Sequence, residues 1–219
     1  MITAERLDRD ALAAVQGRRL AELVAAIYGR NAFYSQKLDA AGLQFDRLQF
    51  PRDLEKLPLT TKAELNADQA ANPPWGTALT EPLERYTRYC QTSSTTGRPL
   101  RWIDTNESWQ FLLDCWKAVY RAARVGNGDR VFFPFSFGPF IGFWSAYDAI
   151  ARRGALLIPS GGMTSAARVQ LARTAGASVL CCTPSYALHL IEVAEQHQTD
   201  TACLGMRAIL GRLCAHADV

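Results

Sequence analysis

The sequence predicts an α/β fold, in which an N-terminal helical segment precedes a mainly parallel sheet with helices on both faces. Two observations support this prediction. Between residues 86 and 210, short apolar segments alternate with stretches of helical periodicity, as they do where helices connect parallel strands. The 219-residue chain is also 48% hydrophobic and 21% charged, an ordinary globular composition with enough apolar residues for a buried core.

The first 85 residues are expected to be helical and rich in loops. Apolar residues recur at helical spacing over residues 12–27, and a shorter helix is expected over residues 34–41. Prolines concentrate in residues 43–84, which favours loops there. Thr61 followed by Glu64 predicts a capping box at the start of a helix.

From residue 86 onward, strands and helices are expected to alternate. Strands are expected at residues 86–92, 100–103, 130–135, 155–158, 178–182 and 207–210, and helices at residues 109–123, 140–153, 164–174 and 184–197. Asp104 and Glu107 are predicted to mark the start of the long helix, which has one apolar face. Thr183 stands at an N-cap position before Pro184. The predicted organisation has three parts: residues 1–85, an incomplete α/β subdomain over residues 86–210, and a tail over residues 211–219.

Composition argues against several classes of protein. The formal net charge is +3 and no run of Lys and Arg occurs, so no nucleic-acid partner is expected. The uncharged run over residues 131–147 is shorter than the roughly 20 residues of a membrane span and is broken by proline and glycine. None of the six cysteines forms a Cys-x-x-Cys pair, so neither a metal site nor a disulfide framework is expected. Free cysteines without a secretory signal favour a cytoplasmic protein with no membrane contact.

A small polar loop separates the strands expected at residues 86–92 and 100–103. It consists of Ser93-Ser94-Thr95-Thr96-Gly97-Arg98-Pro99. Hydroxyl groups, backbone N–H groups and a nearby cation can hold phosphate oxygens, and glycine lets the backbone approach them closely. The loop is not a Walker loop, because no G-x-x-x-x-G-K-[ST] occurs in the chain. Taken alone, the same composition also fits a plain polar hairpin turn.

Together with its surroundings, this loop resembles the phosphate-loop signature of adenylate-forming enzymes, S/T-S-G-T-T-G-K/R-P. The residues that follow it, 100–109, resemble the phenylacetate–coenzyme A ligase branch of that superfamily. Further similar segments occur in the order expected for that branch, at residues 31–35, 41–43, 57–65, 135–142 and 182–186. The resemblance extends to about Leu210 and implies the first half of the large N-terminal domain of these enzymes.

The resemblance implies a two-step reaction. A carboxylate attacks the α-phosphate of ATP to give an acyl adenylate and pyrophosphate, and the thiol of coenzyme A then displaces AMP to give a thioester. Positioning and charge stabilisation dominate such chemistry, with Mg²⁺ as the usual metal. ATP, Mg²⁺ and coenzyme A are therefore the implied cofactors, and no catalytic residue is identified. The implied phosphate-binding residues are Thr92, Ser93, Ser94, Thr95, Thr96, Gly97 and Arg98.

An aromatic stretch over residues 132–144 is the candidate wall of a pocket for an aromatic or other carboxylic acid. By the resemblance, the residues assigned to the pocket are Phe137, Gly138, Phe140, Gly142 and Tyr186. The alternative is ordinary packing, because aromatic residues near a central sheet form cores as readily as pockets. Tyr186 likewise has the alternative of packing at the start of its helix.

The sequence departs from the family pattern in two ways. Ser94 stands where the family loop has glycine, so we expect weaker nucleotide binding and tighter binding of ATP by a Ser94→Gly variant. After Leu210 the expected Gly-Glu-Pro segment, the adenine-stacking aromatic and the lysine-bearing terminal domain do not follow. The chain is therefore expected to be an N-terminal part. Because an incomplete sheet leaves an edge and apolar faces uncovered, we expect it to self-associate.

Three hypotheses about function remain open. The first is the N-terminal part of an aryl or acyl acid–coenzyme A ligase. The second is a non-catalytic module that binds a nucleotide or small molecule, and ATP binding without adenylate formation would distinguish it. The third is a subunit completed by a second polypeptide. The sequence does not specify the acid, because selecting between acids that differ by one methylene is worth only about 1–3 kcal/mol.

Overall fold

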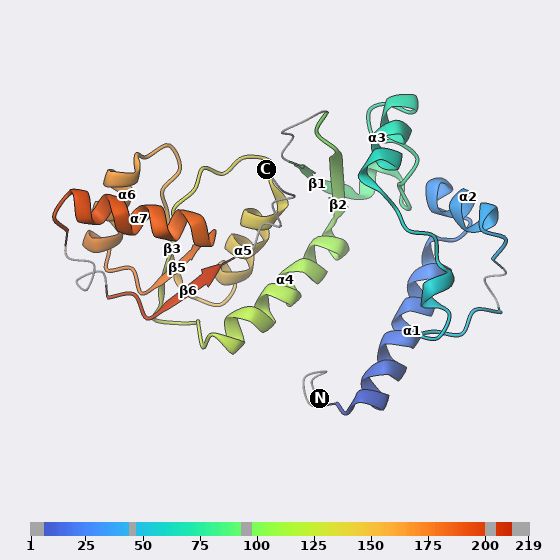
Figure 1. The fold of residues 1–219 in the computed structure, drawn as a ribbon, viewed down its shortest axis with the longest axis horizontal. Coiled ribbons are helices and arrows are strands. Elements are labelled where there is room, and N and C mark those ends of the chain that lie inside the picture. Colours follow the sequence, from blue (N-terminus) through green and yellow to red (C-terminus); the bar gives the residue numbers. More distant parts are fainter. Residues whose placement is uncertain (1–6, 44–46, 93–97, 200–204, 212–219) are drawn as a thin grey trace. The chain divides into compact units, whose positions relative to one another are not determined.

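A computed structural model of the chain describes residues 7–43, 47–92, 98–199 and 205–211 (Figure 1). The chain divides into two compact units, Met1–Ile103 and Asp104–Val219, which are described separately below. The three-part organisation expected from the sequence stays a prediction. No helix in the described ranges has the length and hydropathy needed to cross a membrane.

The first unit consists of helices and loops that end in a β-hairpin. Its elements are α1 (Arg9–Ile27), α2 (Ala32–Ala40), the 3₁₀ helix η3 (Leu54–Lys56), α3 (Lys62–Ala71), the 3₁₀ helix η4 (Leu83–Arg85), β1 (Tyr86–Gln91) and the start of β2 (Arg101–Thr105). The predicted capping box is confirmed: Thr61 accepts a hydrogen bond from the backbone N–H of Glu64, and the Glu64 carboxylate accepts one from the backbone N–H of Thr61.

Two buried amide side chains connect the elements of this unit. Gln69 of α3 donates to the Arg101 carbonyl at 2.7 Å and accepts from the Arg101 N–H at 3.1 Å, which fixes α3 to β2. Asn31 caps α2 by accepting from the Tyr34 N–H, and its amide donates to the Ala78 carbonyl at 2.9 Å. The hairpin that carries the polar loop is therefore held by α3.

The second unit is built on a four-stranded parallel sheet. Its further elements are α4 (Asn106–Ala122), β3 (Arg130–Phe133), α5 (Ile141–Ala151), β4 (Leu156–Pro159), α6 (Ser165–Thr174), β5 (Val179–Cys182), α7 (Pro184–Gln196) and β6 (Ala208–Gly211). The strands lie in the order β4-β3-β5-β6, with Val131 opposite Val179 and Leu180 opposite Ile209. The predicted parallel sheet is confirmed.

Helices cover both faces of this sheet (Figure 1). On one face, Phe132 and Leu180 pack with Val169 of α6 and Leu190 of α7 in one apolar cluster. On the other face, Phe133 contacts Tyr147 of α5 with ring centroids 5.2 Å apart, and Tyr120 of α4 donates to the Ala146 carbonyl. Since neighbouring residues of a strand point to opposite faces, the apolar residues of the two central strands, β3 and β5, are buried on both sides of the sheet.

The structure adds one detail to the sequence prediction and corrects another. Among the described residues, β1 and β2 pair with each other in a two-stranded sheet of their own. The long helix α4 is capped by Thr105, whose hydroxyl accepts from the Ser108 N–H at 3.2 Å, and not by Asp104. Asp104 is the last but one residue of β2 and accepts instead from the Ser108 hydroxyl at 2.9 Å.

Candidate functional site

The connections of the parallel sheet create a switch point between β3 and β5. From β3 the chain continues through α5 to β4 on one side, and from β5 it continues through α7 to β6 on the other side. In open parallel sheets, ligands bind outside the carboxyl ends of the strands at such a point. The residues that follow β3 and β5 are therefore placed where this kind of fold binds its ligand.

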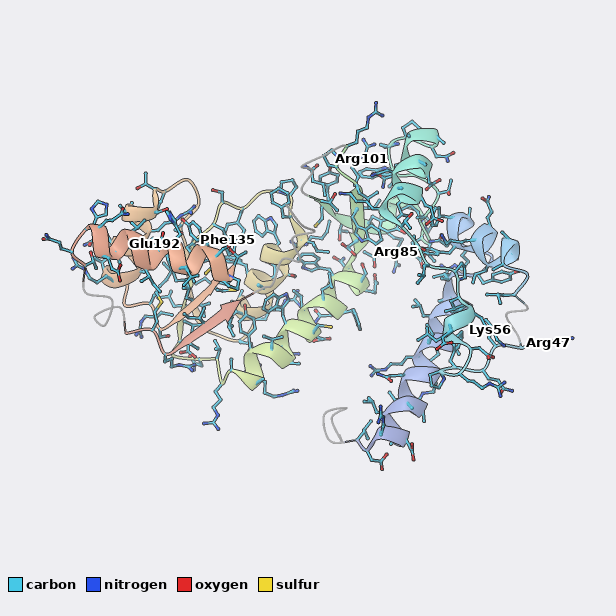
Figure 2. The ribbon with its side chains drawn as sticks, viewed as in Figure 1. Arg47, Lys56, Arg85, Arg101, Phe135 and Glu192 are labelled. Carbon is cyan, nitrogen blue, oxygen red and sulfur yellow. The ribbon has the colours of Figure 1, made fainter. Side chains whose placement is uncertain are left out.

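A pocket of about 260 Å³ lies at this point, and we call it the switch-point pocket. Its wall is formed by Pro134, Phe135, Ser136, Arg168, Cys182, Thr183 and Tyr186. Three of these residues directly follow β3, two lie at the end of β5, and the other two come from α6 and α7. Phe135 of this wall is labelled in Figure 2. An apolar wall with a few polar groups is typical of a site for a small molecule.

The polar groups of the wall form a connected network. Arg168 is only 8% exposed, and it donates from Nη1 to the Tyr186 hydroxyl at 2.6 Å and from Nε to the Ser160 carbonyl at 3.2 Å. The Tyr186 hydroxyl also lies 3.0 Å from the Ser165 hydroxyl, which is 3.1 Å from Nε2 of His189. The network thus joins the end of β4 to the first turns of α6 and α7.

Local sequence signals explain why Arg168 and Tyr186 meet. Thr164 caps α6 by accepting from the Ala167 N–H, and Thr183 caps α7 by accepting from the Tyr186 N–H. Pro184 is the first helical residue of α7, as predicted. Both helices follow the carboxyl ends of strands, α7 after Thr183 alone and α6 after a short loop, so their first turns bring these two side chains to the same edge of the sheet.

The cysteine in this wall is not a reactive nucleophile. Burial raises the pKa of the Cys182 thiol to about 11, and burial raises that of the neighbouring Cys181 to about 12. A thiolate is the reactive form, and its population at neutral pH is then very small. Covalent chemistry on Cys182 is therefore not part of what this pocket offers.

The residues predicted for a substrate pocket lie in two places. Tyr186 lines the switch-point pocket. Phe137 lies in an aromatic cluster, with its ring centroid 4.6 Å from that of Trp144 and 5.1 Å from that of Phe135. Gly138 and Phe140 adjoin this cluster: the Gly138 carbonyl accepts from the Trp144 indole, and a Cβ on Gly138 would meet the Phe140 ring at 2.7 Å.

Gly142, the last residue of that prediction, is buried in the first turn of α5. Its carbonyl accepts from the Ser145 hydroxyl at 3.2 Å. Phe135 connects the two places, because its ring touches Phe137 and also lines the pocket. The assignment of Phe137, Gly138, Phe140 and Gly142 to a substrate pocket stays a prediction.

The predicted phosphate loop is described only at its two ends. Ser93, Ser94, Thr95, Thr96 and Gly97 lie outside the described residues. Thr92 pairs with Leu100 across the hairpin, donating its N–H to the Leu100 carbonyl at 3.0 Å and accepting the Leu100 N–H on its hydroxyl oxygen at 3.1 Å. No described residue accepts the hydroxyl proton of Thr92, and Arg98 is exposed, so both ends of the loop carry groups of the kind that donate to a phosphate.

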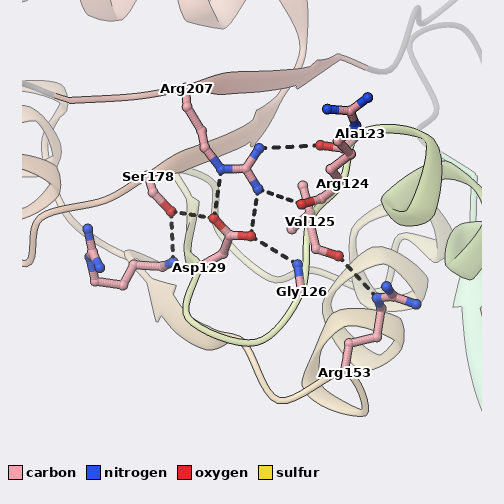
Figure 3. A network of polar contacts seen from close by, with 9 residues as sticks. Ala123, Arg124, Val125, Gly126, Asp129, Arg153, Ser178 and Arg207 are labelled. Atoms are coloured by element: carbon pink, nitrogen blue, oxygen red, sulfur yellow. Dashed lines mark hydrogen bonds and ion pairs between the residues drawn. The ribbon is translucent and has the colours of Figure 1, made fainter.

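A second polar network lies at the opposite edge of the parallel sheet (Figure 3). Asp129, directly before β3, accepts from Nη2 and Nε of Arg207 at 2.6 and 2.9 Å and from the Ser178 hydroxyl at 3.0 Å. The Arg207 guanidinium, with smaller contributions from the Gly126 N–H and the Ser178 hydroxyl, lowers the pKa of Asp129 to about 2. This network joins the amino ends of β3, β5 and β6, and so it stabilises the sheet.

The sequence analysis missed Arg168. A signal was present: α6 buries Arg168, Val169 and Ala172, so this arginine lies on the apolar side of its helix. A charged residue in such a position is rare unless it has a partner or a ligand.

The chain is similar in sequence to known coenzyme A ligases. No protein-family model matches the chain. Phenylacetate–coenzyme A ligase from Escherichia coli (strain K12) is 33% identical over 206 residues, which cover 90% of this chain and 45% of that protein. The ligase of the same name from Thermus thermophilus is 32% identical over 209 residues, which cover 94% of this chain and 46% of that protein.

The fold of the chain is also similar to a solved structure over almost its whole length. A crystal structure of an open conformation of 2-hydroxyisobutyryl-CoA ligase in complex with 2-HIB-AMP and CoA has a TM-score of 0.88 and 26% identity, and covers 97% of this chain and 50% of that chain. Both comparisons show a likeness to coenzyme A ligases, in agreement with the resemblance to the phenylacetate–coenzyme A ligase branch. The chain spans about half the length of the curated relatives it matches, which agrees with the prediction of an N-terminal part.

Proposed function

We propose that this chain is part of a ligase that activates a carboxylic acid with ATP as an acyl adenylate and transfers the acyl group to coenzyme A. The observation that carries the proposal is the 33% identity to a phenylacetate–coenzyme A ligase over 90% of the chain. The fold likeness to a ligase solved with an acyl adenylate and CoA supports it further. An aromatic or other carboxylic acid is the proposed substrate class.

In this proposal the hairpin of the first unit holds the phosphates of ATP. The hydroxyl of Thr92 and the guanidinium of Arg98 would donate to phosphate oxygens, together with residues 93–97 between them. Bound Mg²⁺ supplies charge neutralisation on those phosphates, and it commonly takes most of its ligands from phosphate and water. The protein's own contribution at the hairpin is to orient the phosphates with fixed donors.

Acid-dependent exchange of radiolabelled pyrophosphate into ATP tests the adenylation step directly. The chain would be assayed with phenylacetate and with 2-hydroxyisobutyrate, and ATP binding would be measured by calorimetry on the same sample. Exchange that depends on the acid supports the proposal. The control is a Thr92→Val, Arg98→Gln double variant, which should lose ATP affinity without losing the fold, because Thr92 is only partly buried and Arg98 is exposed.

A second candidate is a module that binds the nucleotide without turning it over. It is favoured by Ser94, which stands where the family loop has glycine. ATP binding without exchange would support this candidate. Exchange that begins only when a second polypeptide is added would instead support a subunit of a split ligase.

We also propose that the chain self-associates. The two edge strands of the parallel sheet expose large apolar side chains, with Leu156 of β4 58% exposed and Ile209 of β6 56% exposed. Open strand edges with apolar residues favour pairing between copies. Light scattering at micromolar concentration should detect dimers or larger species, and a monodisperse monomer would contradict the proposal.

A further inference from the structure

Arg168 is buried in the switch-point pocket without a carboxylate partner among the residues that the structure describes. The side chain's contacts are two hydrogen bonds, to the Ser160 carbonyl and the Tyr186 hydroxyl, and a stacking contact with the Tyr186 ring at 5.5 Å. Both hydrogen-bond acceptors are neutral. Burying a charge without an opposite charge is costly, so a residue kept in this state usually serves a ligand.

Part of the Arg168 guanidinium is not used by the contacts within the protein. Nη2 has no hydrogen-bond partner among the described residues, and it is not fully enclosed. Nη2 therefore has accessible surface, and Arg168 lines the switch-point pocket. Nη1 also keeps one N–H after its bond to Tyr186, so both terminal nitrogens still have an N–H to donate.

Two parallel N–H groups on adjacent nitrogens match the two oxygens of a carboxylate, and they also match two oxygens of a phosphate. The rest of the wall favours the carboxylate. Pro134, Phe135 and the Tyr186 ring offer apolar surface to the body of a ligand. A free phosphate has no apolar body to place there, whereas an aryl or alkyl acid has one.

We propose that the switch-point pocket binds a carboxylate on an apolar ligand, with the Nη1–Nη2 edge of Arg168 as the donor. This inference rests on the proposed function, in which the ligand is the acid substrate, and it assigns the residue that anchors the acid. Tyr186 and the Ser160 carbonyl act as positioning groups, because they hold the guanidinium from its other nitrogens.

The first test uses the unaltered chain and three ligands in titration calorimetry: phenylacetate, its neutral amide phenylacetamide, and inorganic phosphate. A charge-assisted bond to Arg168 should make phenylacetate bind at least about tenfold more tightly than the amide. Equal affinity of acid and amide, or no binding of either, would overturn the inference. Tighter binding of inorganic phosphate than of phenylacetate would overturn the carboxylate assignment in favour of a phosphate group.

The second test uses variants of α6. Arg168→Gln should lower the affinity for phenylacetate about tenfold, to that of the amide, while leaving the affinity for the amide unchanged. Arg173→Gln is the matched control, because Arg173 is exposed on the same helix outside this pocket, and it should bind both ligands as the unaltered chain does. Unchanged phenylacetate binding by Arg168→Gln would contradict the inference.

Thermal unfolding of each variant reports whether it is folded. If Arg168→Gln does not fold, Arg168→Lys keeps the charge and loses the paired donors, so it should fold and prefer the acid over the amide less strongly. A lysine variant with the full preference for the acid would show that paired donors are not needed and would overturn the assignment.

Binding and pyrophosphate exchange separate this inference from the proposed function. Phenylacetate binding that depends on Arg168, in a chain that shows no exchange, would support the pocket assignment while the ligase proposal fails. Exchange by Arg168→Gln with an unchanged KM for the acid would overturn the pocket assignment while the ligase proposal stands.

Discussion

The two units of the chain are stabilised by different kinds of contact. In the first unit, buried polar side chains such as Asn31 and Gln69 satisfy backbone groups of loops. In the second unit, Tyr120, Phe132 and Phe133 are completely buried against a sheet that is covered on both faces. Short helices joined by loops leave many backbone groups to be satisfied by side chains, whereas a parallel sheet satisfies its own and buries apolar area.

The two units also differ in the polar groups that they offer to a ligand. The hairpin of the first unit offers donors at the partly buried Thr92 and the exposed Arg98, which suits a charged ligand that stays partly hydrated. The switch-point pocket of the second unit offers one buried guanidinium within an apolar wall. The first arrangement is suited to phosphates and the second to an acid with an apolar body.

The largest expected effect is loss of a core aromatic in the second unit. Phe132→Ala should lower the free energy of unfolding by about 3–5 kcal/mol, because a completely buried ring is replaced by a cavity. Urea unfolding followed by far-UV circular dichroism measures this change. Phe111→Ala is the matched control, since Phe111 is 66% exposed, and it should change stability by no more than about 0.5 kcal/mol. Equal losses in the two variants would contradict the two-faced core.

A smaller effect is expected from the first unit's buried amide. Asn31→Ala should cost about 1–3 kcal/mol, because it removes a helix cap and leaves the Ala78 carbonyl without its donor. Asp8→Ala removes only an exposed cap of α1 and should cost less, about 0.5–1 kcal/mol. The same unfolding experiment compares them. If Asp8→Ala lowered the free energy of unfolding more than Asn31→Ala does, the burial of Asn31 would not contribute to the stability of this unit.

The smallest expected effect is a change in how the stability of the second unit depends on pH. The pKa of Asp129 falls from 3.8 to about 2 on folding, so its contribution to stability is complete above about pH 4 and is lost as the pH falls toward 2. Asp129→Asn should therefore lower the melting temperature at pH 7 and make it less dependent on pH between 4 and 2. A variant with the same pH profile as the unaltered chain would show that the Arg207 pair contributes nothing measurable.

The pKa of Glu64 in the first unit is lowered in the same way as that of Asp129. Lys37, followed by the N–H and hydroxyl of Thr61, lowers the pKa of Glu64 to about 2. Acidification should therefore destabilise both units, because each contains a carboxylate whose pKa is lowered by a basic partner. In Asp129→Asn, the remaining pH dependence between 4 and 2 is expected to come in part from Glu64, and an added Glu64→Gln substitution should reduce it further.

Local signals in the sequence predicted the elements well, because they act over three or four residues. Thr61 with Glu64, and Thr183 with Pro184, begin helices where they were expected to. The Asp104 prediction failed because Thr105, one residue later, is also a good N-cap residue, and its hydroxyl oxygen caps α4 instead. Two candidate caps in a row cannot be ranked by pattern alone.

The sequence by itself determined the alternation of strands and helices, the caps of α3 and α7, and the resemblance to coenzyme A ligases, because these depend on neighbouring residues and ordered motifs. Only the tertiary structure decided that β1 and β2 form a two-stranded sheet of their own and that β3 and β5 meet at a switch point. It also decided the surroundings of Arg168, since Ser160 and Tyr186 come from the end of β4 and from α7. Contacts between residues 8 and 18 positions apart depend on how strands pair and helices pack, and no local pattern encodes them.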